Sequence, residues 1–194
     1  MRRILSVILF LLLVFSMSTA LAEYANTFEF EPVHFSRKQS LAVYSAPSTK
    51  AWRGAKGKAA VDTSGTVWGA GEYNGWMMVL YEIRGGYRCG YINLAKVKGN
   101  VPHLPQLKFM YNVETRTSEK VGLTDDPWAA SNNITTLKQG TSVSLLGVYN
   151  DYAYVQVMVS KKLACGFVPL SALELSGIEL AEKQDAAEED IGDE

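Results

Sequence analysis

The sequence contains only two histidines, His34 and His103, and only two cysteines, Cys89 and Cys165. Neither histidine stands in a spacing typical of metal ligands. A thiol peptidase needs a cysteine that a nearby histidine activates, whereas both cysteines fall within predicted strands. No glycine-rich loop follows a strand and opens a helix, as a phosphate-binding site would require. We therefore expect a protein that is not an enzyme and that has no metal site and no cofactor.

Long apolar runs are missing beyond the N-terminus. Arg2 and Arg3 precede an almost wholly apolar stretch, residues 4–17, and Ala20-Leu21-Ala22 has the small-x-small pattern of a cleavage site. This pattern predicts a signal peptide at residues 1–22, because the apolar stretch is short for a membrane span. A retained anchor is the alternative. We expect a mature chain that begins near Glu23 and is secreted into the extracytoplasmic cell envelope, with no membrane attachment after cleavage.

No large excess of one charge is present, since 19 Lys and Arg stand against 20 Asp and Glu. Nine of the acidic residues lie in residues 174–194, so the body of the mature chain is mildly basic. This small excess, in an exported chain, argues against a nucleic-acid partner. Residues 174–194 are predicted to form an acidic, flexible tail. The adjacent carboxylates of Asp125 and Asp126 are expected in a solvated turn rather than in a metal site.

An offset of 76 residues aligns the chain with itself. Without a gap, it pairs Gly71 with Gly147 and the dipeptide Cys89-Gly90 with Cys165-Gly166. Glycines, turns and apolar positions keep the same register, which predicts two copies of one module. We place a leader segment at residues 23–32, the first module at 33–98, a linker with glycine and prolines at 99–106, and the second module at 107–173.

Amphipathic helical runs are absent from both modules, and short β-rich stretches take their place. Asn74-Gly75 and Asn150-Asp151 are predicted to form two-residue hairpin turns. Three or four short strands with frequent turns predict an all-β fold made of two small antiparallel barrels.

Side chains on both faces of these strands are apolar. Val155 and Val157 lie on one face of their strand, with Val79 and Tyr81 as counterparts in the first copy. The opposite face would be polar if it met water, yet it carries aromatic and aliphatic residues. Two such modules can cover each other. The residues predicted to pack between the modules are Trp76, Met78, Tyr152 and Tyr154.

Several segments resemble the bacterial SH3 domains of exported proteins. Residues 43–48 are similar to the opening strand and loop, Asn74-Gly75-Trp76 to a turn with its aromatic residue, and residues 166–173 to the closing strand and terminal turn. The resemblance covers residues 33–173. It implies two SH3-like, partly open barrels of five to six strands, which bind cell-wall peptides, glycan or protein partners and have no catalytic role. The cysteine before each repeated glycine departs from the family pattern.

An even pair of cysteines in an exported chain permits a disulfide. A bridge between Cys89 and Cys165 would join the two modules across their apolar faces. It would close a loop of about 77 residues and stabilise the fold by roughly 4 kcal/mol in the chain-entropy treatment. The alternative is that duplication copied one semi-buried thiol, which acts as a small hydrophobe, into both modules.

A basic aromatic loop at residues 50–58 places four cations around Trp52. Such a loop suits an anionic polymer or a peptide carboxylate. The alternative is a solubilising loop whose tryptophan folds back onto the barrel. Trp76 and Tyr91 could line a groove with the loop or lie between the modules. The predicted ligand-binding residues are Tyr44, Trp52, Arg53, Lys56, Lys58 and Tyr91.

We therefore expect a secreted binding protein that recognises cell-envelope components such as wall peptide, glycan or an anionic polymer. The alternative is a structural or adaptor protein whose paired modules bind an extracytoplasmic protein partner. Retention on purified cell wall that weakens with salt would favour the first interpretation, and no retention would favour the second.

Overall fold

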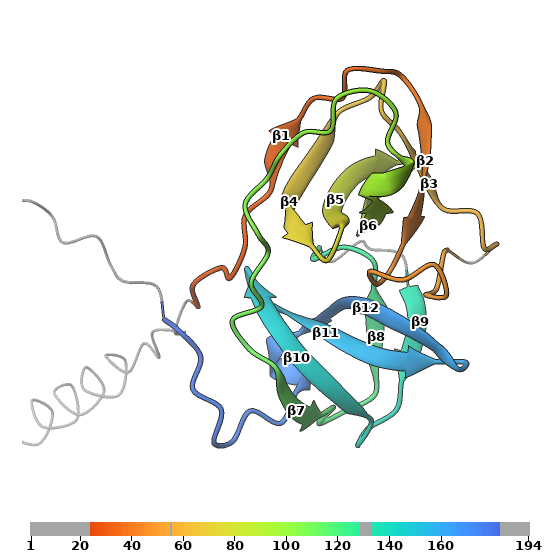
Figure 1. Cartoon of the computed structure of the whole chain (residues 1–194). Coiled ribbons are helices and arrows are strands. Elements are labelled where there is room, and N and C mark those ends of the chain that lie inside the picture. Colours follow the sequence, from red (N-terminus) through yellow and green to blue (C-terminus); the bar gives the residue numbers. More distant parts are fainter. Residues whose placement is uncertain (1–23, 55, 129–132, 183–194) are drawn as a thin grey trace, which may run out of the picture.

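The computed structural model describes residues 24–54, 56–128 and 133–182, which form two six-stranded antiparallel sheets (Figure 1). The predicted all-β class is confirmed. The first sheet contains β1 (Glu31–Val33), β2 (Ser40–Tyr44), β3 (Ala60–Asp62), β4 (Val67–Tyr73), β5 (Trp76–Ile83) and β6 (Gly86–Asn93). The second contains β7 (Val113–Arg116), β8 (Val121–Thr124), β9 (Asn133–Leu137), β10 (Ser142–Tyr149), β11 (Tyr152–Val159) and β12 (Lys162–Pro169). A short 3₁₀ helix follows β6 and β12, namely η1 (Leu94–Lys96) and η2 (Leu170–Ala172).

Both sheets have the same strand order. The first runs β1-β4-β5-β6-β2-β3, and the second runs β7-β10-β11-β12-β8-β9. Each strand therefore has one counterpart, and the duplication seen in the sequence extends to the topology. The two edge strands of each sheet do not pair with each other, so both sheets remain open. We call β1 to η1 the first unit and β7 to η2 the second unit.

Two-residue turns close the central hairpin of each unit, as predicted. Asn74 and Asn150 have φ angles of 49° and 51°, in the left-handed region that asparagine tolerates better than most residues. β4 pairs with β5, and β10 with β11, up to the residues that flank these turns. Turn chemistry at equivalent positions thus sets the same register in both units.

Glycine is required where a connecting segment crosses a bulged strand. The pairing register shifts at Gly71 in β4 and at Gly147 in β10. A Cβ atom on Gly71 would lie 2.9 Å from the carbonyl oxygen of Pro105, and one on Gly147 would overlap Thr27 and crowd the ring of Phe28. A side chain at either position would displace the segment above it, which explains why both copies have glycine.

The repeated Cys-Gly dipeptides have a similar explanation. A Cβ atom on Gly90 would lie 2.7 Å from the carbonyl oxygen of Tyr44, and one on Gly166 would lie 2.5 Å from that of Thr124. β2 therefore crosses β6, and β8 crosses β12, at a distance that only glycine allows.

The cysteine before each glycine joins the two units through its backbone. The amide of Cys89 donates a hydrogen bond of 2.6 Å to the carbonyl oxygen of Asp125, in the second unit. The amide of Cys165 donates one of 3.1 Å to the carbonyl oxygen of Ser45, in the first unit. Each unit thus provides a loop carbonyl, immediately after β2 or β8, to the other unit's β6 or β12.

Each unit has its own core, and a third cluster lies between the units. The core of the first unit includes Val43, Val61, Val67, Met77, Val79 and Ile92, and that of the second includes Leu123, Val143, Leu145, Val155 and Val168. We call the third group the central cluster, with the buried members Phe28, Ala46, Ala51, Trp76, Met78, Leu80, Cys89, Tyr91, Leu107, Leu146, Tyr154, Cys165 and Phe167. The two units therefore share one apolar interface, which hydrophobic burial stabilises.

The connecting segments cross between the units in opposite directions (Figure 1). Before β1 joins the first sheet, the amide of Thr27 donates a hydrogen bond of 2.9 Å to the carbonyl oxygen of Val148 in the second. Before β7 joins the second sheet, the amide of Leu107 donates one of 2.7 Å to the carbonyl oxygen of Glu72 in the first. Both segments thus tie the two units together.

Some predicted boundaries change. β1 begins inside the predicted leader. Residues 174–182, the start of the predicted flexible tail, instead pack on the second unit: the amide of Ala181 donates a hydrogen bond of 2.9 Å to the hydroxyl of Tyr111, and Leu175, Ile178 and Leu180 contact the second core. The predicted signal peptide (1–22) and the end of the tail (183–194) lie outside the described residues.

Candidate functional site

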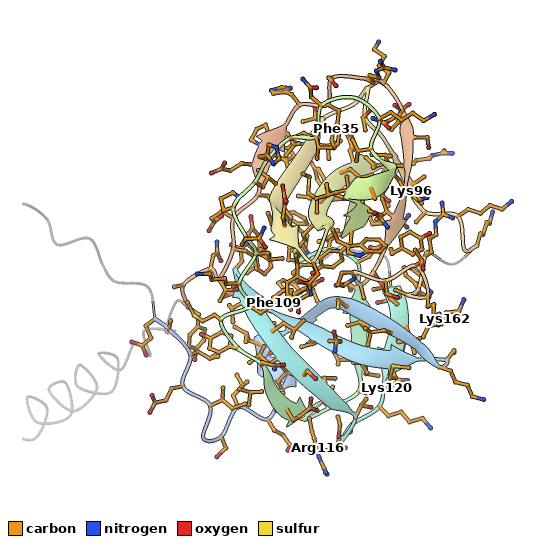
Figure 2. The ribbon with its side chains drawn as sticks, viewed as in Figure 1. Phe35, Lys96, Phe109, Arg116, Lys120 and Lys162 are labelled. Carbon is orange, nitrogen blue, oxygen red and sulfur yellow. The ribbon has the colours of Figure 1, made fainter. Side chains whose placement is uncertain are left out.

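A groove of about 760 Å³ lies where the loop after β2 meets the second unit. Its other wall is formed by β9 and by the hairpin between β11 and β12. We call it the basic groove, and its lining residues are Tyr44, Thr49, Lys50, Ala51, Trp52, Arg53, Gly54, Gly57, Ile134, Thr135, Val159, Ser160 and Lys162. Figure 2 shows Lys162 at the edge of the second unit, below the loop of the first.

Backbone hydrogen bonds fix the loop that carries Trp52. The amide of Trp52 donates to the carbonyl oxygen of Leu163 in β12 at 3.1 Å, and its carbonyl oxygen accepts from the amide of Ser45 at 2.8 Å. The half-buried indole packs against the core of the second unit. The tryptophan therefore folds back, as the alternative interpretation of this loop expected, but onto the neighbouring unit.

Arg53 is held by two contacts within its own unit. Its Nε donates a hydrogen bond of 3.0 Å to the carbonyl oxygen of Ala59. Its guanidinium carbon lies 5.4 Å from the centroid of the Tyr44 ring, within the range of a cation–π interaction. The half-buried guanidinium is thereby positioned at the groove before any ligand arrives.

Positive charge dominates the groove. Lys50, Arg53 and Lys162 line it, and among the residues that the structure describes no aspartate or glutamate does. Within the described part of the chain, these three cations form no ion pair. Cations in a concave wall without nearby carboxylates raise the local positive potential and attract anions. The arrangement is therefore suited to binding a negatively charged ligand.

The structure brings together part of the predicted binding set. Tyr44, Trp52 and Arg53 line the groove. Lys56 and Lys58 are exposed on the same loop but do not line it. Tyr91 lies apart from the groove, fully buried in the central cluster.

Sequence reasoning missed the contribution of the second unit to this groove. Lys162 lines it together with Ser160, and Lys161 is exposed beside them in the hairpin turn. In the sequence, the dipeptide Lys161-Lys162 indicates only a turn between two strands. Its proximity to the basic loop depends on how the two units pack, which the sequence pattern does not specify.

The residues predicted to pack between the modules lie in the central cluster or against it. Trp76, Met78 and Tyr154 are buried members, and Tyr152 packs on the cluster partly buried. The hydroxyl of Tyr154 donates a hydrogen bond of 3.1 Å to the hydroxyl of Tyr91. Burial raises the pKa of both tyrosines well above its usual value, so both hydroxyls remain protonated.

Cys89 and Cys165 are free thiols in the structure, so the disulfide alternative is not realised. Both belong to the central cluster, as the alternative of a small buried hydrophobe expected. Burial raises the pKa of the Cys89 thiol well above its usual value and that of Cys165 to about 12. Thiols of this kind are poor nucleophiles.

The expectation that Asp125 and Asp126 occupy a solvated turn is wrong. Asp125 is 3% exposed and Asp126 is 2% exposed. The second unit buries them against the first, where Nε of Arg88 lies 2.6 Å from Oδ2 of Asp125. Burial raises the pKa of Asp125, and the Arg88 guanidinium opposes this shift without cancelling it.

Both histidines are exposed to solvent, whereas both thiols are buried. No group of three or more potential metal-ligating side chains occurs among residues 24–54, 56–128 and 133–182. Within the same ranges, no helix has the length and apolar character needed to cross a bilayer.

The described residues therefore form a basic groove, an ion pair between the two units (Arg88 and Asp125) and a central cluster rich in aromatic residues. Comparisons with protein-family models, with curated proteins and with solved structures found no match to this chain.

Proposed function

We propose that this protein is an exported binding protein that holds an anionic polymer of the cell envelope in the basic groove. The observation that carries the proposal is the set of three cations, Lys50, Arg53 and Lys162, in a concave wall whose described lining residues include no carboxylate. A polymer that bears repeated phosphate or carboxylate groups matches this wall in charge. The protein would act by recognition alone, without a catalytic step.

Each type of side chain in the groove has a role in this proposal. The lysines provide mobile point charges, whereas the positioned Arg53 guanidinium donates directed hydrogen bonds to an anionic group. Tyr44 and Trp52 offer apolar surface to the uncharged part of the polymer. Because the lining comes from both units, neither unit alone would form the complete site.

The finer fold assignment, two SH3-like barrels of the bacterial kind, is part of the same proposal. Three features support it: the identical strand order of both units, the 3₁₀ turn after β6 and β12, and the short hairpins at equivalent positions. The resemblance in sequence covers residues 33–173, which is nearly the span of the two units. Modules of that family bind wall components, which agrees with an envelope ligand.

Binding to purified cell wall and to a soluble polyphosphate tests the proposal. We expect retention at low salt that falls as salt rises, because exposed charges are screened. Lys162→Ala should weaken binding, and the double variant Lys50→Ala/Lys162→Ala should weaken it further. Arg116→Ala is the matched control, since it also removes one exposed cation but lies at the far end of the second unit (Figure 2). Equal losses in Lys162→Ala and Arg116→Ala would contradict a specific groove.

A second candidate function, adaptor for a protein partner, is favoured by one surface feature. Tyr87 of the first unit and Trp128 of the second are 38% and 37% exposed, with ring centroids 5.3 Å apart. Large aromatic side chains at a surface are common in protein interfaces. Two results together would favour this function over the first: the wild type does not bind cell wall, and a protein partner binds the wild type but not Tyr87→Ser.

A further inference from the structure

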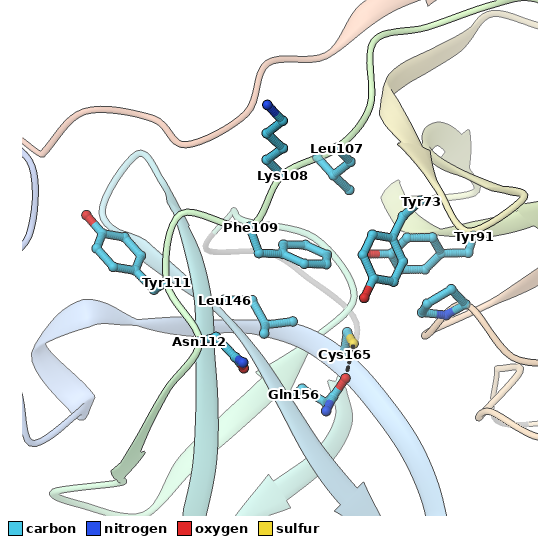
Figure 3. A pocket seen from close by; sticks show the side chains of 11 residues that line it. Tyr73, Tyr91, Leu107, Lys108, Phe109, Tyr111, Asn112, Leu146, Gln156 and Cys165 are labelled. Carbon is cyan, nitrogen blue, oxygen red and sulfur yellow. Dashed lines mark hydrogen bonds between the residues drawn. The ribbon is translucent and has the colours of Figure 1, made fainter.

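A second pocket, of about 430 Å³, lies beneath the linker between the two units (Figure 3). We call it the linker pocket. The residues that line it come from both units and from the segment 97–112 between η1 and β7, here called the linker in this wider sense: Pro47, Tyr73, Tyr91, Leu107, Lys108, Phe109, Tyr111, Asn112, Leu146, Gln156 and Cys165. Its volume is within the range of small-molecule sites, about 300–1,000 Å³. It shares no lining residue with the basic groove.

The lining combines aromatic rings with amide groups. Figure 3 shows the rings of Tyr73 and Phe109 next to each other on one wall, with their centroids 5.3 Å apart. The amides of Asn112 and Gln156 lie toward another end of the pocket. Among its described lining residues there is no acidic side chain, and the one cation, Lys108, is exposed. The pocket therefore offers apolar faces and neutral hydrogen-bonding groups, and little charge.

The amide groups have hydrogen-bonding capacity to spare. Gln156 is half-buried, and the only hydrogen bond of its side chain among the described residues is a weak one of 3.9 Å from the Cys165 thiol to Oε1. The side chain of Asn112 forms none with a described residue. An amide has both donor and acceptor positions. A ligand with hydroxyl groups, which also donate and accept, would satisfy them.

The linker wall is held in place before any ligand binds. The amide of Leu107 donates to Glu72, and the amide of Tyr111 donates to the carbonyl oxygen of Leu146 at 3.2 Å. The hydroxyl of Tyr111 in turn accepts from the amide of Ala181. A wall that is already ordered does not lose conformational entropy on binding, which favours affinity.

The residue that corresponds to Gln156 in the first unit is apolar. Leu80 is the residue equivalent to Gln156, since each pairs with the repeated cysteine of the next strand, and Leu80 is only 6% exposed. The two copies of the module have thus diverged at this position. A half-buried glutamine amide without a strong protein partner leaves donor and acceptor positions for water or for a ligand.

We infer that the linker pocket binds a neutral saccharide of one or two rings. A pyranose ring presents a C–H face that packs on Tyr73 and Phe109, and equatorial hydroxyls that hydrogen-bond to Asn112 and Gln156. Among the described lining residues, a cationic ligand would meet no carboxylate, and an anionic one would meet a single exposed cation, Lys108. The site goes beyond the proposed function, because it differs in position and in ligand charge from the basic groove.

Saturation-transfer NMR and titration calorimetry with cellobiose and N,N′-diacetylchitobiose, on the full mature chain, test the inference. We expect saturable binding of at least one of the two disaccharides. Gln156→Leu should lower its affinity about tenfold, as loss of a directed hydrogen bond does. This variant restores the residue found in the other copy, so the fold should tolerate it. Gln139→Leu, at an exposed position outside the pocket, is the matched control.

The outcomes separate this inference from the proposed function. Lys162→Ala should leave disaccharide binding unchanged while it weakens polyanion binding, and Gln156→Leu should do the reverse. No binding of either disaccharide at 10 mM, about the weak limit for a small specific site, would overturn the inference. Equal affinity in Gln156→Leu and wild type would also overturn it. Neither result would affect the basic groove.

Discussion

The hydroxyl group of Tyr154 in β11 donates a hydrogen bond of 3.1 Å to the hydroxyl group of Tyr91 in β6, and neither residue is more than 1% exposed. The two residues belong to different units. Buried hydroxyl groups need partners, so this bond favours one particular placement of the units. It lies inside the cluster that the apolar outer faces of both units create.

Loss of one hydroxyl group should destabilise the fold more than loss of both. Tyr154→Phe leaves the Tyr91 hydroxyl buried without a partner and should cost about 1–3 kcal/mol. Because Tyr91→Phe/Tyr154→Phe removes both polar groups, its unfolding free energy should exceed the value expected from adding the single changes. Urea denaturation of the wild type, of each single variant and of the double variant gives the four unfolding free energies of this double-mutant cycle. Strictly additive changes would show that the two hydroxyls do not interact.

Asp125 should make folding depend on pH in a defined direction. Burial raises its pKa above the value in the unfolded chain, near 3.8. The folded state therefore binds this proton more tightly, and the stability from the group is present below pH 3.8 and lost as pH rises through the folded pKa. The unfolding free energy of wild type minus that of Asp125→Asn should fall over this window. A difference that increases with pH would mean that the Arg88 ion pair outweighs burial.

Gly147 should not tolerate a side chain, since Thr27 and Phe28 of the leader cross directly above it. Gly147→Ala should destabilise the protein by about 1–3 kcal/mol through overpacking, and it should expose residues 24–30 to protease. Gly65→Ala is the control, because its Cβ would meet only the Asp62 carbonyl oxygen, at an ordinary 3.7 Å. Identical unfolding curves for both variants would contradict the crossing.

Two thiols should be detected once the chain is unfolded without reductant. In the native protein, burial limits access, and the raised pKa of Cys165, about 12, leaves almost no thiolate at pH 8. Reaction with an aromatic disulfide reagent should therefore be slow before denaturation and should reach two thiols per chain after it. An unfolded, unreduced protein with no reactive thiol would establish the Cys89–Cys165 bridge instead.

Local signals in the sequence were sufficient for the central strands and for the duplication, but they predicted three or four strands in each module, where each sheet has six. The hairpin at Asn74-Gly75 follows from turn chemistry, and the apolar residues on both strand faces indicated packing between modules. The same approach failed at Asp125, where adjacent carboxylates usually indicate a solvated turn. Its burial depends on Arg88 from the other unit, and no local pattern contains that information.

Local sequence patterns also could not predict which unit the crossing segments contact. Thr27 and Phe28 lie before the first module in sequence but pack on the second. Lys162 completes the basic groove from the opposite unit. Each of these contacts depends on the relative placement of two units, which the buried central cluster determines and which a repeat offset alone does not specify.

The central claim is that the two units share one interface and unfold together. Hydrogen exchange with mass spectrometry, followed across increasing urea, compares amide protection in β5 of the first unit with that in β11 of the second. We expect both strands to lose protection in one transition with the same midpoint. Loss of protection in one strand at a urea concentration where the other remains fully protected would contradict the claim.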